Sequence, residues 1–319
     1  MKSKLHICVL QIGMTRNIGG LETYLMQQFE HISKKIKYDF VNITGEYEIA
    51  FKDKIIDQKS EIYNIPSRHK NPILHYWKWI KLLNRYGNKY KFIVLNCNSL
   101  EYVYPIFIAK LFGIPNRIIH SHNAGFENKI SLKRKILIVF NKILIKYSAT
   151  DYWACSKLAG EWMFGKKRKF KVIHNAIDVD KFKFNKDVRD DMRKQLNIKD
   201  DQFVVGHVGR FSYQKNQEFA VDIFYELEKI HKDAVLLLIG KEDQDVYSKV
   251  IKKVNDLKID KKVKVLGIRD DIPALYQPMD CFVLPSLFEG LLIMGVEAQV
   301  SDLYTVFSDA ISEKLKLLI

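Results

Sequence analysis

The chain has 319 residues, of which 47% are hydrophobic and 28% charged, so it reads as a globular protein long enough for two domains. Its 52 Lys and Arg outnumber 37 Asp and Glu, and the net charge of +15 indicates an anionic partner: nucleic acid, a membrane surface or a phosphorylated substrate. The four cysteines lie far apart in apolar runs, which favours a reducing cytoplasm and argues against a zinc site. No apolar run approaches the ~20 residues of a membrane span, and the start is too short for a signal peptide, so any membrane contact is expected to be peripheral.

Short β-branched runs alternate with longer amphipathic segments along the whole chain. Strands are expected at residues 5–13, 38–43, 91–98, 116–122, 151–156 and 171–177, and then at 203–209, 234–240, 263–267, 281–286 and 304–310. Strands that alternate with helices imply right-handed βαβ crossovers and parallel sheets. Eleven strands are too many for one compact sheet in a chain of this length. The predicted fold class is therefore α/β, with two doubly wound Rossmann-like domains.

The boundary between the domains is predicted near residue 176, where the polar and irregular stretch 178–202 begins. This gives an N-terminal domain at 1–175 and a C-terminal domain at 176–319. Ligands of open α/β sheets bind at the carboxyl ends of the strands, so two such domains are expected to face a cleft. The chain stops soon after its last expected strand, without further covering helices. We therefore expect the C-terminal domain to be either unusually small or truncated.

Candidate residues in the first half follow expected strands. Gly19 and Gly20 precede a helical run, where backbone N–H groups can approach an anion. The spacing is not a dinucleotide fingerprint, because no third glycine follows, and a plain strand-to-helix turn is the alternative. His120 and His122 end another strand and fall on the same side of it by the period of two. A single histidine at a strand end is more often structural than catalytic.

Candidate residues in the second half are two cations and two acids. Arg210 and Lys215 follow the strand at 203–209, and cations of these two shapes suit a diphosphate, although a solvated basic loop is the alternative. Glu289 and Glu297 lie in an apolar stretch with no obvious cation beside them. Carboxylates accept hydrogen bonds from vicinal hydroxyls, and the N–H groups of residues 291–294 suit an anion. A capping role for one glutamate and a solvated position for the other remain possible.

Two segments combine cations with apolar and aromatic side chains. Residues 129–150 contain no acid but carry Lys129, Lys133, Arg134, Lys135, Lys142 and Lys146 on an Ile- and Leu-rich frame. Upstream, Tyr76, Trp77 and Trp79 lie among further cations. Basic amphipathic helices with such aromatics indicate contact with an anionic membrane surface. A core-packed helix with a solvated basic face is the alternative, and nucleic acid is not expected because no binding motif accompanies the charge.

Several motifs occur in order along nearly the whole chain: "IGGLETYL", "RIIHSHN", "VIHNAIDVDKF", "GHVGRFSYQKN", "LLLIGKE", "VKVLGIRDDIPALYQPMDCFVLPSLFEG" and the E-x7-E pair of Glu289 and Glu297. Because these motifs occur together and in this order, the chain resembles the retaining glycosyltransferases of family 4, particularly the bacterial members that build capsular polysaccharides and exopolysaccharides. The resemblance implies a GT-B fold. Its N-terminal domain would bind the acceptor, and its C-terminal domain, incomplete here, would bind the nucleotide sugar.

The resemblance also implies roles for individual residues. Arg210 and Lys215 would hold the donor diphosphate and stabilise it as it leaves, so that neither a metal nor a cofactor is needed. Glu297 would bind the nucleotide ribose, and Glu289 the hydroxyls of the donor sugar. Further implied contacts with the donor come from Gly19, Gly20, Gly267, Arg269, Gly290 and Leu291.

The resemblance further implies that the anomeric configuration of the transferred sugar is retained. His122, with His120 as the alternative, would lie close to the transferred sugar. No carboxylate is obviously placed as a nucleophile, so attack is expected on the face from which the nucleotide departs.

The chain departs from the family pattern at three positions. Leu292 stands where the family usually has Gly or Pro. Asp302 and Tyr304 stand in "SDLY" where "SGLP" is common, and Asp302 is expected to take the left-handed conformation of that glycine.

The leading hypothesis is an enzyme that is cytoplasmic and peripheral on the inner face of the plasma membrane. It would move a hexose-type sugar from a donor such as a UDP- or GDP-sugar to a glycan acceptor linked to a polyprenyl diphosphate. One alternative is a truncated inactive remnant that binds a sugar nucleotide or a partner. Another is a sugar-nucleotide epimerase on the same fold. A two-carboxylate glycosidase is disfavoured, because the diphosphate-binding cations would have no role.

Overall fold

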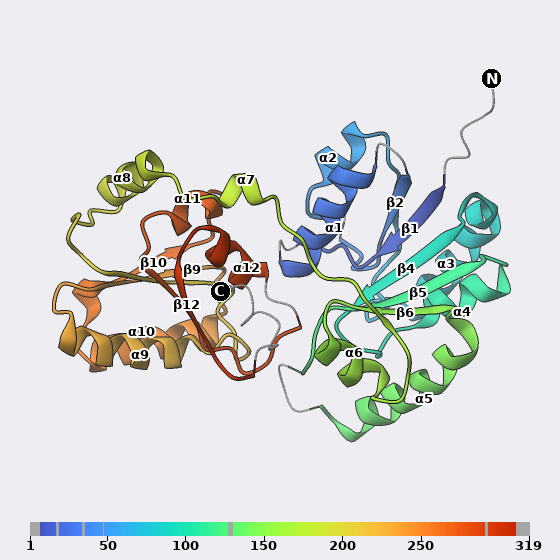
Figure 1. The fold of residues 1–319 in the computed structure, drawn as a ribbon. Helices are drawn as coiled ribbons and strands as arrows, with labels where there is room; N and C mark the ends of the chain where they lie inside the picture. The colour runs from blue at the N-terminus through green and yellow to red at the C-terminus, as the bar shows by residue number, and fades with distance from the viewer. Residues whose placement is uncertain are drawn as a thin grey trace. The chain divides into compact units, whose positions relative to one another are not determined.

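The computed structural model describes residues 7–16, 19–33, 36–46, 48–126, 130–290 and 293–310, and the chain divides into two compact units. One unit contains Met1–Ala124 and Lys129–Ala176, and the other contains Gly125–Asn128 and Ile177–Ile319. Each unit consists of helices around one parallel sheet (Figure 1). The predicted fold class, two Rossmann-like α/β domains, is confirmed. Among the described residues, none of the helices combines the length and the apolar character that crossing a bilayer requires.

The first unit has a described sheet of seven strands in the order β3-β2-β1-β4-β5-β6-β7. The strands are β1 (Cys8–Ile12), β2 (Lys37–Asn42), β3 (Ile62–Asn64), β4 (Phe92–Cys97), β5 (Asn116–Ser121), β6 (Asp151–Ala154) and β7 (Lys171–Val172). The helices are α1 (Gly20–Ile32), α2 (Lys52–Asp57), α3 (Pro72–Tyr86), η1 (Gly87–Lys89), α4 (Tyr104–Leu111), α5 (Leu132–Ser148) and α6 (Lys157–Phe164). All six strands expected in this half are present. The sequence did not predict β3, because this edge strand is three residues long and has no fully buried residue.

The second unit has a described sheet of five strands in the order β10-β9-β8-β11-β12. The strands are β8 (Val204–Val208), β9 (Val235–Ile239), β10 (Val263–Gly267), β11 (Cys281–Leu284) and β12 (Tyr304–Phe307). The helices are α7 (Val179–Phe182), α8 (Lys186–Gln195), α9 (Gln217–Ile230), α10 (Gln244–Asp256), η2 (Asp260–Lys262), α11 (Ile272–Tyr276) and α12 (Ile293–Val300). All five strands expected in this half are present.

The strand order places the ligand-binding end of each sheet. In the second unit the chain runs outward from β8 through β9 to β10, and then returns to the other side of β8 with β11. In the first unit β1 lies in the same way between β2 and β4. Open α/β sheets bind their ligands at the carboxyl ends of strands where the order reverses. A ligand is therefore expected at the loops after β8 and β11, and at those after β1 and β4.

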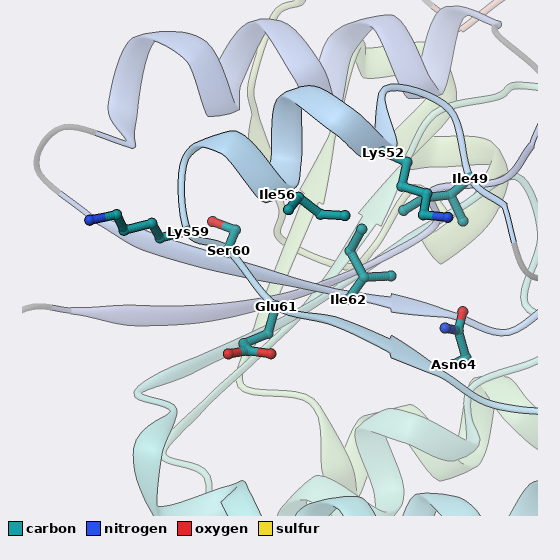
Figure 2. Close-up of a pocket in the computed structure, with 8 residues that line it drawn as sticks. All are labelled: Ile49, Lys52, Ile56, Lys59, Ser60, Glu61, Ile62 and Asn64. Carbon is teal, nitrogen blue, oxygen red and sulfur yellow. The ribbon is translucent and has the colours of Figure 1, made fainter.

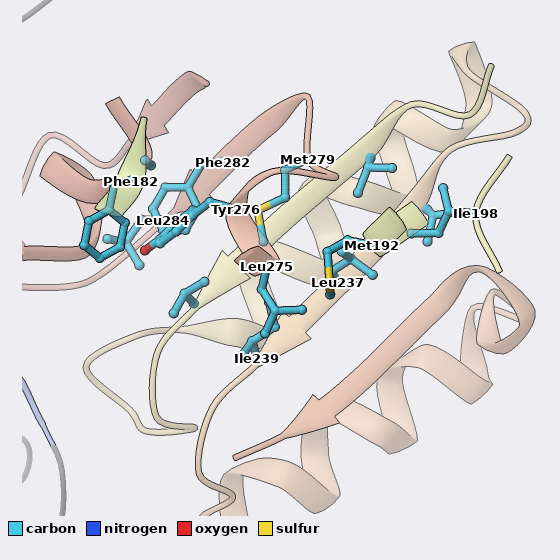
Figure 3. Close-up of a cluster of buried hydrophobic side chains, with 14 residues drawn as sticks. Phe182, Met192, Ile198, Leu237, Ile239, Leu275, Tyr276, Met279, Phe282 and Leu284 are labelled. Carbon is cyan, nitrogen blue, oxygen red and sulfur yellow. The ribbon is translucent and has the colours of Figure 1, made fainter. Parts of the chain in front are cut away.

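Apolar residues cover both faces of the second sheet. All five residues of β9 are buried, which explains their continuous apolar run in the sequence. Alternate residues of β9 contribute to two different clusters because neighbouring side chains point to opposite faces. The larger cluster is drawn in Figure 3 and consists of Phe182, Met192, Ile198, Val204, Val208, Val235, Leu237, Ile239, Leu275, Tyr276, Met279, Phe282, Leu284 and Ala298.

The stretch 178–202, which we expected to be irregular, contains α7 and α8. A buried arginine explains why α8 shows no clear apolar period. Arg193 is 2% exposed and donates to carbonyl oxygens, including that of Pro278 at 3.0 Å, and to the Asp280 carboxylate at 2.9 Å. Asp280 also accepts from Arg189 at 2.6 Å and from the Val204 N–H at 2.7 Å. These bonds attach α8 to the start of β8, so a polar sequence still forms a packed helix.

Asp302 ends α12 in the left-handed conformation that the family resemblance implied, with a φ of 61°. The Asp302 N–H donates to the Gln299 carbonyl at 3.1 Å, and the Leu303 N–H donates to the Ala298 carbonyl at 3.2 Å. These two bonds form a Schellman motif, in which glycine is the usual residue at this position.

We expect Asp302→Gly to raise the free energy of unfolding by about 0.5–1 kcal/mol, because glycine takes a positive φ without a steric cost. Asp302→Ala should lower it, because alanine has the Cβ but no polar group for a local hydrogen bond. Urea unfolding followed by circular dichroism would measure both variants. A lower stability of Asp302→Gly would contradict this account of the helix end.

Candidate functional site

The loop after β8 is fixed by a buried glutamine that sequence reasoning missed. Gln217, the first residue of α9, donates to the Arg210 carbonyl at 2.8 Å and to the Gly209 carbonyl at 3.3 Å, and it accepts from the Ser212 N–H at 3.3 Å. The Gly240 backbone has a φ of 150°, and a Cβ there would lie 2.1 Å from the Gly209 carbonyl oxygen. The loops after β8 and β9 therefore approach each other closely. This approach leaves no room for a side chain at Gly240.

Lys215 lies in this fixed loop and forms a buried ion pair with Glu289. Its Nζ lies 2.6 Å from Glu289 Oε1, and the two residues are only 8% and 7% exposed. The expectation that neither glutamate has a cation beside it is therefore wrong for Glu289. The cation was not recognised because it lies 74 positions earlier in the chain, in the loop after another strand.

Further hydrogen bonds connect the loop after β8 to the loop after β11. The Gln214 side chain donates to the Phe288 carbonyl at 3.0 Å, and the Gln214 carbonyl accepts from the Leu287 N–H at 2.8 Å. The Asn216 side chain donates to the Pro285 carbonyl at 3.2 Å. The predicted cation loop and the predicted glutamate loop are thus held together at the carboxyl ends of β8 and β11. The position of Lys215 beside Glu289 follows from these connections.

Glu297, on α12, is the second buried acid of this site. It is 7% exposed, and Tyr276 of α11 donates its hydroxyl hydrogen to Glu297 Oε2 at 2.9 Å. Burial raises the pKa of Glu297 to about 7, although the Tyr276 hydrogen bond and the charge of Lys215 act in the opposite direction. At neutral pH the carboxyl is therefore close to half protonated. Lys215 interacts electrostatically with both glutamates, so these three residues form one site.

His207 is a further buried group that sequence reasoning did not single out. It lies in β8 and is 1% exposed. Burial and the nearby charge of Lys215 lower the pKa of His207 to about 3, so its ring is neutral at physiological pH. The His207 ring therefore adds no positive charge beside Lys215.

The remaining predicted contacts of the second unit lie on the same loops or after the edge strand. Arg210 is exposed at the start of the loop that carries Lys215. Gly267 ends β10 with a φ of 63°, and Arg269 forms a forked pair with Asp271 at 2.8 and 2.6 Å. Gly290 is buried beside Glu289. Two predicted positions, Leu291 and Leu292, lie outside the described residues.

In the first unit the two histidines lie together, as their spacing predicted. The ring centroids of His120 and His122 are 4.0 Å apart, and the ring of Tyr24 in α1 lies 4.9 Å from His122 and 5.3 Å from His120. Burial lowers the pKa of His120 to about 3 and lowers that of His122 well below its ordinary value. Both rings are therefore neutral at pH 7. They can donate or accept hydrogen bonds but supply no positive charge.

The tautomer of His122 follows from a buried asparagine of β4. Asn96 donates from Nδ2 to Gln11 Oε1 at 2.8 Å and to the Ile12 carbonyl at 3.0 Å. Its Oδ1 therefore faces His122 Nε2, at 3.1 Å, as an acceptor. His122 carries its proton on Nε2 and leaves Nδ1 as the acceptor. Asn96 was not predicted, since nothing in "LNCN" separates it from an ordinary strand residue.

Gly19 and Gly20 occupy the predicted position at the start of α1, with Gly19 as its N-cap. Glu22, in the first turn, is buried and accepts from the Thr15 hydroxyl at 2.6 Å. A carboxylate in the first turn interacts favourably with the positive end of the helix. It also competes there with any external phosphate. The glycines therefore offer an open approach, while Glu22 makes this helix end less suitable for a second anion.

Among the cavities that the described residues of the first unit form, two bear on where the site lies. One of about 230 Å³ opens after β1, β2 and β4, and its lining includes Gly13, Asn96, Asn98, Ser99, Glu101 and Tyr102. It adjoins the histidine cluster through Asn96. The other, of about 470 Å³, lies beside edge strand β3 and is lined by Ile49, Lys52, Ile56, Lys59, Ser60, Glu61, Ile62 and Asn64 (Figure 2). None of the residues predicted for the functional site lines this second cavity.

Comparison with known proteins shows to which family the part of the chain with Lys215 and the two glutamates belongs. Residues 188–314 match the model of the family described as glycosyl transferases group 1. These residues form a glycosyl transferases group 1 domain. The matched segment begins in α8 and ends just after the last described residue, so it contains most of the second unit. The sequence resemblance to glycosyltransferases is confirmed at this level.

Curated relatives of this glycosyltransferase domain extend the likeness to most of the chain. The "Putative glycosyltransferase EpsF" of Bacillus subtilis (strain 168) is 27% identical over 313 residues, which cover 96% of this chain and 80% of the relative. The "UDP-Gal:alpha-D-GlcNAc-diphosphoundecaprenol alpha-1,3-galactosyltransferase" of Escherichia coli is 27% identical over 306 residues, covering 92% of this chain and 76% of the relative. The family match and these relatives show that the chain is an enzyme of the transferase class.

Solved structures confirm the GT-B fold. The crystal structure of Anabaena Alr3699/HepE in complex with UDP-glucose has a TM-score of 0.79 at 20% identity and covers 96% of this chain and 81% of its own. The structure of WaaG, a glycosyltransferase involved in lipopolysaccharide biosynthesis, has a TM-score of 0.72 at 14% identity and covers 95% and 81% of the two chains. At these identities the likeness establishes the fold of the glycosyltransferase.

Proposed function

We propose that the protein is a retaining, metal-independent glycosyltransferase that transfers a hexose-type sugar from a nucleoside diphosphate donor to a glycan acceptor in capsular polysaccharide or exopolysaccharide synthesis. The observation that carries this proposal is the buried trio of Lys215, Glu289 and Glu297 at the carboxyl ends of β8 and β11. A buried cation that is paired with one acid and acts electrostatically on a second suits a ligand that has both a diphosphate and several hydroxyl groups. HepE has been solved with UDP and with UDP-glucose, which supports a donor of this kind.

The donor diphosphate would displace Glu289 from Lys215. Lys215 then pairs with a phosphate oxygen, and exposed Arg210 binds the same diphosphate with its forked guanidinium. Glu289, released from its ion pair, accepts hydrogen bonds from hydroxyls of the donor sugar. Glu297 accepts hydrogen bonds from the ribose. Gly290, Leu291, Gly267 and Arg269 complete the donor contacts in this proposal, with Gly267 and Arg269 near the base.

In the transfer step the bond between the anomeric carbon and the leaving phosphate oxygen breaks, and its electron pair goes to the phosphate. An acceptor hydroxyl forms the new bond on the same face, and its proton passes to the departing phosphate. Lys215 and Arg210 stabilise the negative charge that develops there, the task that a bound Mg²⁺ performs in other transferases. His122 lies near the transferred sugar in this proposal, with its Nε2–H fixed by Asn96.

The acceptor would bind in the first unit, in the cavity of about 230 Å³ after β1, β2 and β4. Asn98, Ser99 and Glu101 provide hydrogen-bonding groups for sugar hydroxyls in its lining. The name of the Escherichia coli relative specifies an acceptor on diphosphoundecaprenol, which supports a polyprenyl diphosphate carrier here. A lipid carrier requires the enzyme to work at a membrane. We therefore propose a cytoplasmic protein that is peripheral on the inner face of the plasma membrane.

Transfer of the sugar to a lipid-linked glycan should keep its anomeric configuration, and EDTA should not reduce the turnover. The assay uses UDP- and GDP-sugars with a lipid-linked acceptor, and nuclear magnetic resonance reads the configuration of the new bond. Retention is expected because the acceptor attacks on the face from which the nucleotide departs in this proposal, and EDTA resistance because the two cations bind the diphosphate. Inversion, or loss of turnover in EDTA, would contradict the proposal. A parallel reaction without acceptor is the control, since conversion of the donor alone would indicate an epimerase.

A further inference from the structure

The helix α5 has a continuous apolar stripe on its exposed face. Six large apolar or aromatic residues recur along it at spacings of three and four, so they lie on one face of the helix. Each is between 55% and 72% exposed: Leu132, Ile136, Val139, Phe140, Ile143 and Tyr147. Scattered exposed apolar residues are ordinary on protein surfaces, whereas a contiguous row is typical of a surface that another body covers.

Cations flank this stripe on both sides. By helical spacing Lys133 lies along one margin, and Lys135, Lys142 and Lys146 lie along the other. The 17 residues of α5 contain no acid that could neutralise these lysines within the helix. An apolar stripe with lysines on both margins has the pattern of a helix that lies in the plane of a membrane interface.

The opposite face holds α5 in place on the first unit. Asn141, Ile145 and Ser148 are buried, and the Asn141 side chain donates to the Leu100 carbonyl at 2.6 Å. Arg134, the remaining cation of the helix, binds the Glu101 carboxylate in a fork at 2.9 and 2.7 Å. The stripe is therefore presented by a fixed helix at the periphery of the unit (Figure 1).

These contacts decide between the two sequence interpretations of this segment. A core-packed helix with a solvated basic face would bury its apolar residues, but most of those in α5 point outward. For helix α3, the interpretation that its aromatic residues contact a membrane surface is only partly correct. Trp77 is 50% exposed, whereas Trp79 is completely buried in the core and cannot contact a membrane.

We infer that the stripe of α5, from Leu132 to Tyr147, inserts into the interfacial region of an anionic lipid bilayer. The apolar side chains would enter the boundary between headgroups and acyl chains, while the flanking lysines reach the anionic headgroups. Charge complementarity favours this occupant over a second copy of the chain, which would bring two rows of lysines together. The inference deepens the peripheral location proposed above and rests on it for its role in transfer. Membrane binding itself needs neither donor nor acceptor.

The experiment is co-sedimentation of the full chain with vesicles of phosphatidylcholine alone and of phosphatidylcholine mixed with phosphatidylglycerol. Wild type should bind the mixed vesicles. Phe140→Ser with Ile143→Ser should weaken this binding about tenfold or more, because two side chains no longer enter the interface. The matched control is Ile230→Ser with Ile268→Ser, at two similarly exposed positions of the second unit. This control should bind like wild type.

A second pair of variants tests the charges. Lys133→Gln with Lys135→Gln should weaken binding to the mixed vesicles by about fivefold per lysine removed. Lys249→Gln with Lys261→Gln makes the same change of net charge at exposed positions of the second unit and should have a much smaller effect. The affected side chains are on the surface, so thermal unfolding of all four variants should match wild type.

Three results would overturn the inference. These are no binding of wild type to mixed vesicles, α5 variants that bind like wild type, and equal weakening by the control variants. Sedimentation velocity in solution provides the alternative outcome: a dimer that the Phe140 and Ile143 changes dissociate, with no vesicle binding, would make the stripe a contact between copies. Calorimetry with UDP separates this inference from the proposed function. If the chain binds vesicles but not UDP, the membrane inference is supported and the proposed function is contradicted.

Discussion

Replacing Lys215 by alanine should abolish UDP and GDP binding within the range of a calorimetric titration and lower turnover by roughly 10²–10³-fold. The reason is that Lys215 is the buried cation of the donor site and lies 2.6 Å from Glu289. Lys249→Ala, at an exposed position of α10, is the matched control and should bind both nucleotides as wild type does.

The same substitution also removes one partner of a buried ion pair. Glu289 would be left charged without its partner, which costs about 3 kcal/mol or more of stability. Lys215→Ala with Glu289→Gln removes that charge and should recover much of the melting temperature that Lys215→Ala alone loses. UDP carries no donor sugar, so the loss of Glu289 should not itself affect the titration. If this double variant regains UDP binding, Lys215 is only structural and the proposed diphosphate site is wrong.

The strands that build the site could be predicted from sequence because their patterns are local. Buried parallel strands give continuous apolar runs such as that of β9, and all eleven expected strands are present. The left-handed Asp302 was expected from the family resemblance, because a glycine is common at this position of the family. The exceptions are also local in origin. Strand β3 is too short to show a pattern, and α8 packs through a buried arginine, a residue type that usually marks the surface.

The candidate residues could be named from sequence, but most of their partners could not. Lys215 and Glu289 are 74 positions apart, and Tyr276 precedes Glu297 by 21, so neither pair is related by a helical or strand period. Only the fold brings such residues together. The histidine pair is the contrasting case, because two positions on one strand are related by its period, and the rings are adjacent. Gln217 and Asn96 act through bonds to backbone and side-chain atoms, for which the sequence has no marker.

Glu297→Gln should make the protein more stable at pH 8 and bind nucleotide less well. The folded-state pKa of Glu297 is about 7, above the ordinary value of 4.5, so the folded state holds this proton more tightly than the unfolded chain. Its contribution to stability is therefore present below about pH 4.5 and is lost as pH rises to 7. The cost above pH 7 is about 3 kcal/mol. Glutamine keeps an acceptor for the Tyr276 hydroxyl without this cost.

The measurements are thermal unfolding and UDP titration across pH 5 to 8, with Glu242→Gln at an exposed position as the control. The melting temperature of Glu297→Gln should exceed that of wild type at pH 8, and the difference should shrink as pH falls. UDP binding should weaken about tenfold at pH 8, because the ionised carboxylate can accept from both ribose hydroxyls while the amide has one acceptor oxygen. Below pH 7 the wild-type carboxyl gains a proton, so the two proteins should converge.

The two readouts of Glu297→Gln together decide what the buried acid is for. A gain in stability with a loss of binding means that the fold keeps a carboxylate at a cost because the ligand needs it, as is common at functional sites. A gain in stability with unchanged binding would remove Glu297 from the donor site and leave Lys215 and Glu289 to carry the proposal. A loss of stability at pH 8 would contradict the raised pKa and its physical cause, the burial of the carboxyl beside Tyr276.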